Sequence, residues 1–364
     1  MDKKFFIGIA AMAALTLVSC SSDDLDSFSD NSSKNEAISF DGYLGRSAVA
    51  VNGTRGSEET KTTLMAKGFG VFSKYNGSAS FPDFDNQKVT YSNSKWTYTP
   101  LKFWPTDGQI DFYAYAPYKE SQKLKENTTT FDFTVADNAA GQEDLLWAKA
   151  PGQITTNGAN TKEKVKIHFY HALSRLGYSV KLYGDNSSST AKFILNSIKL
   201  AGSSDGTSKK AFYKTGTIDL SKKNGVGDLW NTSSSSSNEG KQNFDWVSSD
   251  KQVDNTGIKN AGTDYLFVIP QDFSQTKSEG HDVDELYVIV KYTIDYGAGV
   301  TQENTVYKQI KRKFEQGHAY MLNLTIGLPI EFDVAVEATG GVGVEDWGAD
   351  TDINIGSNDN PWDR

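Results

Sequence analysis

Apolar and polar side chains alternate along most of the chain from Ile38 onward. This period of two runs through 95–98, 109–115, 130–135 and 165–169, and later through 176–182, 193–195, 218–220, 265–269, 286–290, 320–324 and 330–336. Because successive side chains of a strand point to opposite faces of a sheet, the alternation predicts half-buried strands. No window of twelve residues after the first twenty has a sustained helical apolar stripe. The predicted class is therefore all-β.

Two β-sandwiches account for the 364 residues better than one, since a domain commonly has about 100–200 residues. The boundary is predicted near Leu173, which gives an amino-terminal domain over 38–173 and a carboxy-terminal domain over 174–364. The run from Val165 to Tyr183 leaves the junction open, because it also fits one long strand shared by both sandwiches.

The first twenty residues differ from the rest of the chain. Lys3 and Lys4 precede an apolar stretch that is too short to span a bilayer comfortably, and Leu17-Val18-Ser19-Cys20 closes it. This segment resembles a bacterial lipoprotein signal, with 1–19 as the signal peptide and Cys20 as the lipid-bearing first residue. Cys20 is the only cysteine, so it cannot form an intrachain disulfide, a metal cluster or a redox pair. The alternative is a plain secretory signal with an unrelated cysteine.

Residues 20–37 are dominated by Ser, Asp and Asn and contain very few apolar side chains. Such a segment cannot bury enough surface to offset chain entropy, so it is predicted to be a flexible tether. Asp23 and Asp24 resemble the short signal that sends lipoproteins of Bacteroidetes-type bacteria to the outer face of the outer membrane. An ordinary polar linker fits these residues equally well.

The overall charge excludes one class of partner. The chain has 37 Lys and Arg against 46 Asp and Glu, a net charge of −9, whereas a general nucleic-acid binder needs a surplus of cations for phosphate contacts. Aromatic residues make up 12% of the chain. That many large rings indicate substantial buried apolar surface.

The sequence offers no constellation for catalysis, metal or cofactor binding. His168 and His171 are three residues apart, which on a strand places them on opposite faces, and no Cys, Asp or Glu lies close by in sequence to complete a zinc set. Asp350 to Asn354 begins like a calcium loop, but Ile355 stands where that loop requires Gly. Gly-x-Ser-x-Gly, His-Glu-x-x-His and phosphate-loop motifs do not occur. We therefore expect a protein that is not an enzyme and holds no metal or cofactor.

A series of short motifs resembles the fimbrillin family, and more narrowly its Mfa-like branch of type V pilins and accessory subunits. The motifs follow the lipoprotein signal and the tether in this order: Ile38-Ser39-Phe40, Thr54-Arg55-Gly56, Gly70-Val71-Phe72, 112–117, 144–148, 169–176, 317–322 and 344–347. The resemblance implies two transthyretin-like β-sandwiches in tandem and assembly into fimbriae at the outer membrane and cell surface. Its implied partners are other fimbrial subunits, of the same or an accessory kind.

The resemblance also implies proteolytic maturation. Arg46 and Arg55 lie in the polar stretch between the first predicted strand and the next, and members of the family are cut at an Arg in this region. An Arg-specific protease would then release the first strand, with Ile38 and Phe40, together with the lipid. Arg55 is favoured because Thr54-Arg55-Gly56 follows Gly53 and precedes a polar run, with Arg46 as the second candidate. The alternative is that Arg55 is merely a solvated loop residue.

The end of the chain carries a second set of apolar residues after the last clear strand. Val342, Val344, Ile353 and Ile355 are the candidates for a donor strand within 342–364, which would fill the groove opened in another subunit. From Glu331 to the end of the sequence there are nine acidic residues and one basic residue, Arg364. A solvated acidic tail is the alternative interpretation.

The competing function is a lipid-anchored surface protein that binds a host glycan or protein, either as a fimbrial tip adhesin or as a stand-alone lectin. Exposed tryptophans that stack on sugars would supply its platform. The candidates are Trp96, Trp104, Trp147, Trp230 and Trp246. Aromatic residues on strands are more often part of the core, which favours the fimbrial interpretation.

Overall fold

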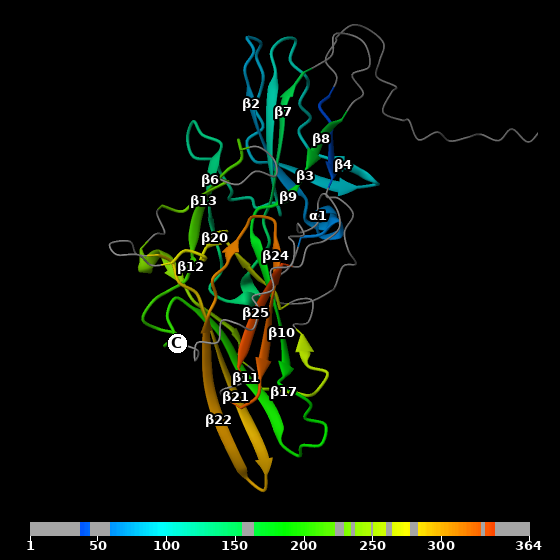
Figure 1. Ribbon diagram of the computed structural model, residues 1–364. Coiled ribbons are helices and arrows are strands. Elements are labelled where there is room, and N and C mark those ends of the chain that lie inside the picture. Colours follow the sequence, from blue (N-terminus) through cyan, green and yellow to red (C-terminus); the bar gives the residue numbers. More distant parts are fainter. Residues whose placement is uncertain are drawn as a thin grey trace, which may run out of the picture. The chain divides into compact units, whose positions relative to one another are not determined.

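The computed structural model consists mostly of strands (Figure 1). It describes residues 37–43, 59–154, 164–222, 229–233, 237–248, 250–259, 264–276, 283–328 and 332–338. Within these residues there is one α-helix, α1, together with short 3-10 turns such as η1 (Ala139–Gly141) and η3 (Asn238–Gly240). The predicted β class is confirmed. None of the helices in the described part is long and apolar enough to cross a membrane.

The amino-terminal part is built on a six-stranded sheet. Its order is β4 (Lys95–Thr97), β3 (Gln87–Ser92), β2 (Phe69–Tyr75), β5 (Ile110–Ala116), β7 (Leu146–Gln153) and β9 (Tyr170–His171). All its pairings are antiparallel. A separate parallel pair, β1 (Phe40–Tyr43) with β8 (Val165–His168), contributes to the same hydrophobic core, whose buried members all come from 38–169.

The carboxy-terminal part contains two larger sheets. One has the order β18 (Ile258–Lys259), β10 (Ser174–Leu182), β24 (Ala319–Ile326) and β25 (Asp333–Ala338), with β19 (Leu266–Val268) also pairing with β10. The other has the order β16 (Phe244–Val247), β11 (Lys192–Ala201), β21 (Tyr287–Gly297) and β22 (Val300–Gln309), with β17 (Lys251–Val253) also on β11. Apolar side chains of both sheets share one core, in which Tyr178 of β10 packs edge-on against Trp246 of β16.

Three smaller sheets complete the described structure. They are β14 (Trp230–Asn231), β13 (Thr215–Asp219) and β6 (Thr130–Thr134); β12 (Phe212–Tyr213) with β15 (Lys241–Gln242); and β20 (Gln271–Asp272) with β23 (Lys313–Phe314). The antiparallel β6–β13 pairing joins strands from the two sides of Leu173. Phe267 N also donates a hydrogen bond to Gln142 Oε1 across the same boundary, at 2.7 Å. The division into domains over 38–173 and 174–364 stays a prediction.

The run from Val165 to Tyr183 is broken into three strands, so the single long strand that it also fitted does not form. β8, β9 and β10 are separated at Phe169 and at the pair Ala172-Leu173, whose side chains are all buried. Gly317 N donates a hydrogen bond to Leu173 O, which ties this break to the loop before β24.

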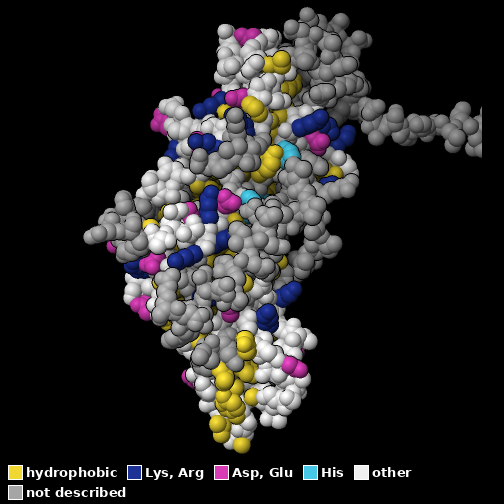
Figure 2. Space-filling model, in the orientation of Figure 1, with side chains coloured by type: hydrophobic (Ala, Val, Ile, Leu, Met, Phe, Trp, Pro, Cys, Tyr) yellow, Lys and Arg dark blue, Asp and Glu magenta, His cyan; other side chains and the backbone are white. Residues whose placement is uncertain are grey.

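Exposed large apolar side chains are found at the β21–β22 hairpin. Tyr296 and Val300, next to its turn, are 44% and 59% exposed. Figure 2 shows hydrophobic side chains gathered at this lower end of the view, whereas cations and anions are mixed over the rest of the visible face.

Helix α1 (Lys61–Lys67) is the element that the alternation did not predict. Thr60 caps it, since its Oγ1 accepts a hydrogen bond from Thr63 N while Thr63 Oγ1 accepts one from Thr60 N. Gly68 ends the helix at φ +73°, where a side chain would be strained. Only Leu64 of the helix is buried, so the seven residues of α1 show no apolar stripe with the period of a helix.

A group of charged residues, of which Glu59, Asp144 and His171 are buried, holds the start of α1. The Glu59 side chain is fully buried and forms an ion pair with Lys67, which also pairs with Glu143 at 2.9 Å. The backbone N–H of Glu59 donates to Asp144 Oδ2, the same oxygen that lies 2.7 Å from His171 Nδ1. One Glu59 carboxylate oxygen, Oε2, has no hydrogen-bond partner among the described residues. We call these five residues the Glu59 cluster.

Burial raises the pKa of Glu59, although hydrogen bonding to Lys67 opposes the shift. The folded protein therefore holds this proton more tightly than the unfolded chain does. As a consequence, the contribution of Glu59 to the free energy of unfolding falls as the pH rises from the ordinary value of 4.5 through the raised pKa.

Replacing Lys67 with Met should lower the free energy of unfolding at pH 7 by about 3 kcal/mol, because Glu59 would remain buried without its cation. The loss should shrink as the pH falls toward the raised pKa of Glu59, because a protonated carboxyl needs no cation. Urea unfolding followed by tryptophan fluorescence at pH 7 and at successively lower pH measures the loss. The double variant Glu59→Gln with Lys67→Met is the control and should recover much of the loss. Equal stability of Lys67→Met and the parent at pH 7 would contradict this role of the cluster.

Candidate functional site

Strand β1 lies in the amino-terminal core and is held there by backbone contacts at both ends. It runs parallel to β8, with Phe40 opposite Val165. Two residues before it, Ile38 N donates to Lys102 O at 2.8 Å, and Ile38 O accepts from the Tyr98 hydroxyl at 2.7 Å. Near its end, Gly42 O accepts a hydrogen bond from the Trp96 indole at 3.2 Å.

The inward face of β1 fills an aromatic slot. Ile38 and Phe40 are each 1% exposed, and the Phe40 ring centroid lies 5.3–6.5 Å from the ring centroids of four neighbours: Phe69, Phe84, Tyr98 and Phe112. A Cβ at Gly42 would lie 2.9 Å from the Phe69 ring, so only glycine fits at this third inward position. The burial of Ile38 and Phe40 contributes about 1.5–3 kcal/mol each.

Most of the other predicted site residues lie outside the described residues. This holds for Cys20, for Arg46 and Arg55 between β1 and α1, and for Val342, Val344, Ile353 and Ile355 in the tail. Strand β25, which precedes the tail, pairs with β24 and buries Val334 and Val336. The described part of the predicted last strand is therefore confirmed.

The candidate tryptophans divide between core and partly exposed positions. Trp104, Trp147 and Trp246 are buried, as expected for core aromatics. Trp96 is half-buried beneath β1. Trp230 is also half-buried, but it lines a hollow in the surface.

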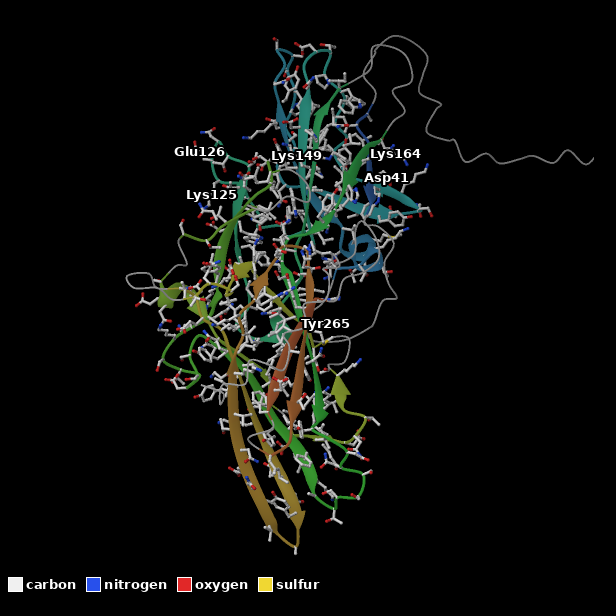
Figure 3. All side chains as sticks on the ribbon, viewed as in Figure 1. Asp41, Lys125, Glu126, Lys149, Lys164 and Tyr265 are labelled. Atoms are coloured by element: carbon white, nitrogen blue, oxygen red, sulfur yellow. The ribbon has the colours of Figure 1, made fainter. Side chains whose placement is uncertain are left out.

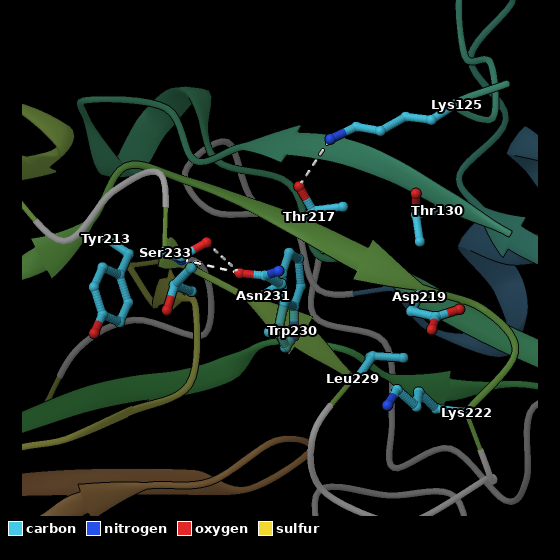
Figure 4. Close-up of a pocket in the computed structure, with 11 residues that line it drawn as sticks. Lys125, Thr130, Tyr213, Thr217, Asp219, Lys222, Leu229, Trp230, Asn231 and Ser233 are labelled. Carbon is cyan, nitrogen blue, oxygen red and sulfur yellow. Dashed lines mark hydrogen bonds between the residues drawn. The ribbon is translucent and has the colours of Figure 1, made fainter. Parts of the chain in front are cut away.

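This hollow, which we call the β13 pocket, has a volume of about 850 Å³ (Figure 4). Strands β6, β13 and β14 and the segments beside them form its wall. The lining residues are Lys125, Thr130, Tyr213, Thr217, Asp219, Lys222, Leu229, Trp230, Asn231, Thr232 and Ser233. Lys125 enters from the loop before β6, where Figure 3 labels it next to Glu126.

Hydrogen bonds fix several polar groups of the β13 pocket. Lys125 Nζ donates to Thr217 Oγ1 at 3.1 Å. Asp219 Oδ1 accepts from Thr129 Oγ1 at 2.7 Å and from Ser221 N at 2.9 Å. Burial alone would raise the pKa of the Asp219 carboxyl, but these hydrogen bonds outweigh it and the pKa lies below its usual value. Thr217 Oγ1 in turn donates a hydrogen bond to Asp132 Oδ1.

The two neighbouring histidines have structural contacts. His171 is buried with its Nδ1 2.7 Å from Asp144 Oδ2, and the ring of His168 stacks on Tyr170. Asp144 is 27 residues away in sequence, which is why sequence proximity did not reveal it. The part of the chain that the structure describes contains no group of three or more His, Cys, Asp or Glu residues that could hold a metal ion.

Comparison with known proteins finds fimbrial relatives. Residues 54–347 match the fimbrillin-like family. The chain is 30% identical over 233 residues to the fimbrium subunit Fim1C of Phocaeicola vulgatus, a match that covers 57% of this chain and 59% of that protein. A fimbrial protein from Bacteroides vulgatus, known from its crystal structure, has a similar fold. The TM-score is 0.57 at 19% identity, over 83% of this chain and 98% of that one.

The family match spans most of the sequence and includes the described strands from β2 to β25. It confirms the resemblance indicated by the ordered motifs. Because fimbrillins are structural proteins, it also agrees with the prediction that the chain is not an enzyme. The chain belongs to the fimbrillin-like family.

Proposed function

We propose that this chain is a structural subunit of cell-surface fimbriae of the type V pilin class. Its precursor would be lipidated, cut at an arginine and polymerised by donor-strand exchange. The observation that carries the proposal is the position of β1, a short strand whose apolar face fills an aromatic slot and which precedes the segment with Arg46 and Arg55. The fimbrial relatives support the same function.

The proposed architecture and location follow from the same class. The chain would form two transthyretin-like sandwich domains over 38–173 and 174–364. It would be attached to the outer membrane through Cys20 until an Arg-specific protease acts. Its partners would be other fimbrial subunits, and its final location the fimbrium.

Removal of β1 would expose the rings of Phe69, Phe84, Tyr98 and Phe112 and leave one edge of β8 unpaired. A strand with alternating apolar residues from another subunit meets both needs, because it restores backbone pairing and refills the slot. The tail segment 342–364 is the candidate donor.

Cleavage alone is not expected to release β1. A cut after Arg46 or Arg55 breaks none of the contacts that hold β1, so its pairing with β8, its hydrogen bonds and the burial of Ile38 and Phe40 are all kept. A competing strand can replace these contacts one by one. The incoming donor strand, rather than the protease, would then displace β1.

The second candidate function is that of a lipid-anchored surface protein that binds a glycan, and the β13 pocket with Trp230 favours it. Immunogold electron microscopy of the cell surface separates the two. Label along fibres supports a shaft subunit, label only at fibre ends supports a tip adhesin, and label without fibres supports the stand-alone binding protein.

Replacing Cys20 with Ala should abolish attachment to the outer membrane, because the chain has no other cysteine to carry the lipid. The variant should be soluble or remain unprocessed at the inner membrane, as measured by cell fractionation and acyl labelling. Unchanged partition into the outer membrane would refute lipidation at Cys20.

Arg55→Ala should block maturation in whole cells, and protein sheared from the parent cells should begin at Gly56 when sequenced from its amino terminus. Arg46→Ala is the matched control and should leave that terminus unchanged. If sheared protein from the parent begins at Ser47, Arg46 is the site instead. Assembled protein that begins at Cys20 would exclude cleavage.

Replacing Val342 and Val344 with Ser should leave a folded, cleaved monomer that does not polymerise, because the donor strand would lose apolar side chains that enter the slot. The matched control, Asp350→Asn with Asp352→Asn, alters the charge of the tail and should still polymerise. Electron microscopy and size-exclusion chromatography measure both. Fibres of normal length from the Ser variant would show that assembly uses another surface.

A further inference from the structure

Strand β22 forms one outer edge of the sheet that contains β16, β11, β21 and β22. Its ten residues, Val300–Gln309, pair with β21 on one side, and none of the other described strands pairs with it. The backbone groups along its other side therefore have no strand partner among the described residues. An outer strand of this length is a template to which a further strand can add by backbone hydrogen bonding.

This edge lacks the features that usually prevent strand addition, which are a short length, proline and charged side chains. Across residues 300–307 the sequence has no proline and one charged side chain, Glu303. Lys308 follows, but its charge is compensated by an ion pair with Asp333 of β25. The other outer strands of the described sheets have at most six residues, and the longest of them, β25, contains two charged residues, Asp333 and Glu337.

The side chains on one face of β22 are exposed along its whole length. They are Thr301, Glu303, Thr305 and Tyr307, whereas Asn304 and Val306 on the opposite face are buried. The Tyr307 side chain is 57% exposed, and its ring packs edge-on against Tyr287 of β21 with the centroids 6.3 Å apart. This contact presents the phenol group at the surface of the sheet, beside the apolar end of the hairpin in Figure 2.

We propose that β22 pairs with β22 of a second copy of this chain, in an antiparallel arrangement with a two-fold axis at Thr305. A two-fold axis makes the interface isologous, so that each contact occurs twice. This register places Tyr307 opposite Glu303 of the second copy, and Glu303 opposite its Tyr307. The phenol hydroxyl donates and the carboxylate accepts, so one strand supplies both members of a complementary pair.

The charges of β22 favour this register over its neighbours. An axis at Glu303 would place two carboxylates opposite each other, and an axis at Lys308 would do the same with two ammonium groups, which is unfavourable. With the axis at Thr305, Lys308 faces the neutral Gln302 of the second copy. The pairing goes beyond the proposed fimbrial function and does not involve the slot of β1, which belongs to other sheets.

Sedimentation velocity of the purified, uncut chain tests the proposal. In this form β1 fills its own slot, so association does not require donor-strand exchange. We expect a concentration-dependent equilibrium between monomer and dimer, with a dissociation constant below about 500 µM, because a single pair of strands makes a small interface. A chain that remains monomeric at about 500 µM would overturn the proposal.

Charge variants at the two-fold axis locate the interface. Thr305→Lys and Thr305→Glu should each weaken the dimer about fivefold, because each places like charges opposite each other across the axis. An equimolar mixture of the two variants should form a heterodimer at least as tight as the parent dimer, since opposite charges then meet. Unchanged dimers of both variants, or a mixture that does not associate, would overturn the pairing at Thr305.

Thr90→Lys is the matched control, because Thr90 is an exposed strand residue of β3 and the variant makes the same charge change on another sheet. It should dimerise like the parent. Should either Thr305 variant fail to fold, Tyr307→Ser replaces the pair. It removes the proposed partner of Glu303 and should weaken the dimer about threefold, whereas an unchanged dissociation constant would overturn the proposal.

Discussion

The aromatic rings of the amino-terminal core are shielded from water only while a strand covers them. Phe40 completes a cluster of rings supplied by β2, β5 and the loops around them, and β8 has its parallel partner in the same strand. Exposed rings are unfavourable in water, and unpaired backbone groups are unfavourable in a packed interior. Water can satisfy the backbone of β8 but not the rings. Only another strand with the same alternation can meet both requirements.

The chain is anchored independently on both sides of residues 44–58. Before this segment, β1 is held by β8, by Tyr98 and by the ring cluster. After it, Glu59 is held by Lys67 and Asp144. The two anchors use different partners and different forces, apolar burial in one case and charge pairing in the other. A cut between them would therefore leave both in place, and the body of the subunit would keep its Glu59 cluster when β1 departs.

Alternation along the sequence predicted the β class and longer strands such as β5, β10, β21 and β24, because burial on one face of a sheet imposes a period of two. It did not predict β7 or the largely exposed β22. It could not predict α1, whose seven residues bury a single side chain and depend on the cap at Thr60. The buried contact of His171 with Asp144 and the β6–β13 pairing could not be predicted either, because both join residues far apart in sequence. Of the proposed assembly site, Ile38 and Phe40 were indicated by the family resemblance, whereas the rings that receive them were not.

The β13 pocket follows from the same alternation, applied to a sheet that has little apolar surface on one side. On β13, Gly216 and Ile218 are buried, whereas Thr215, Thr217 and Asp219 alternate with them. Their partners on β6 in the antiparallel register are Thr134, Asp132 and Thr130, so this face is polar on both strands. A face of hydroxyl and carboxylate groups gains little from being covered by another strand, because burial would cost it hydration. The aromatic slot of β1 and the polar face of β13 thus have opposite surface chemistry, and they belong to different sheets.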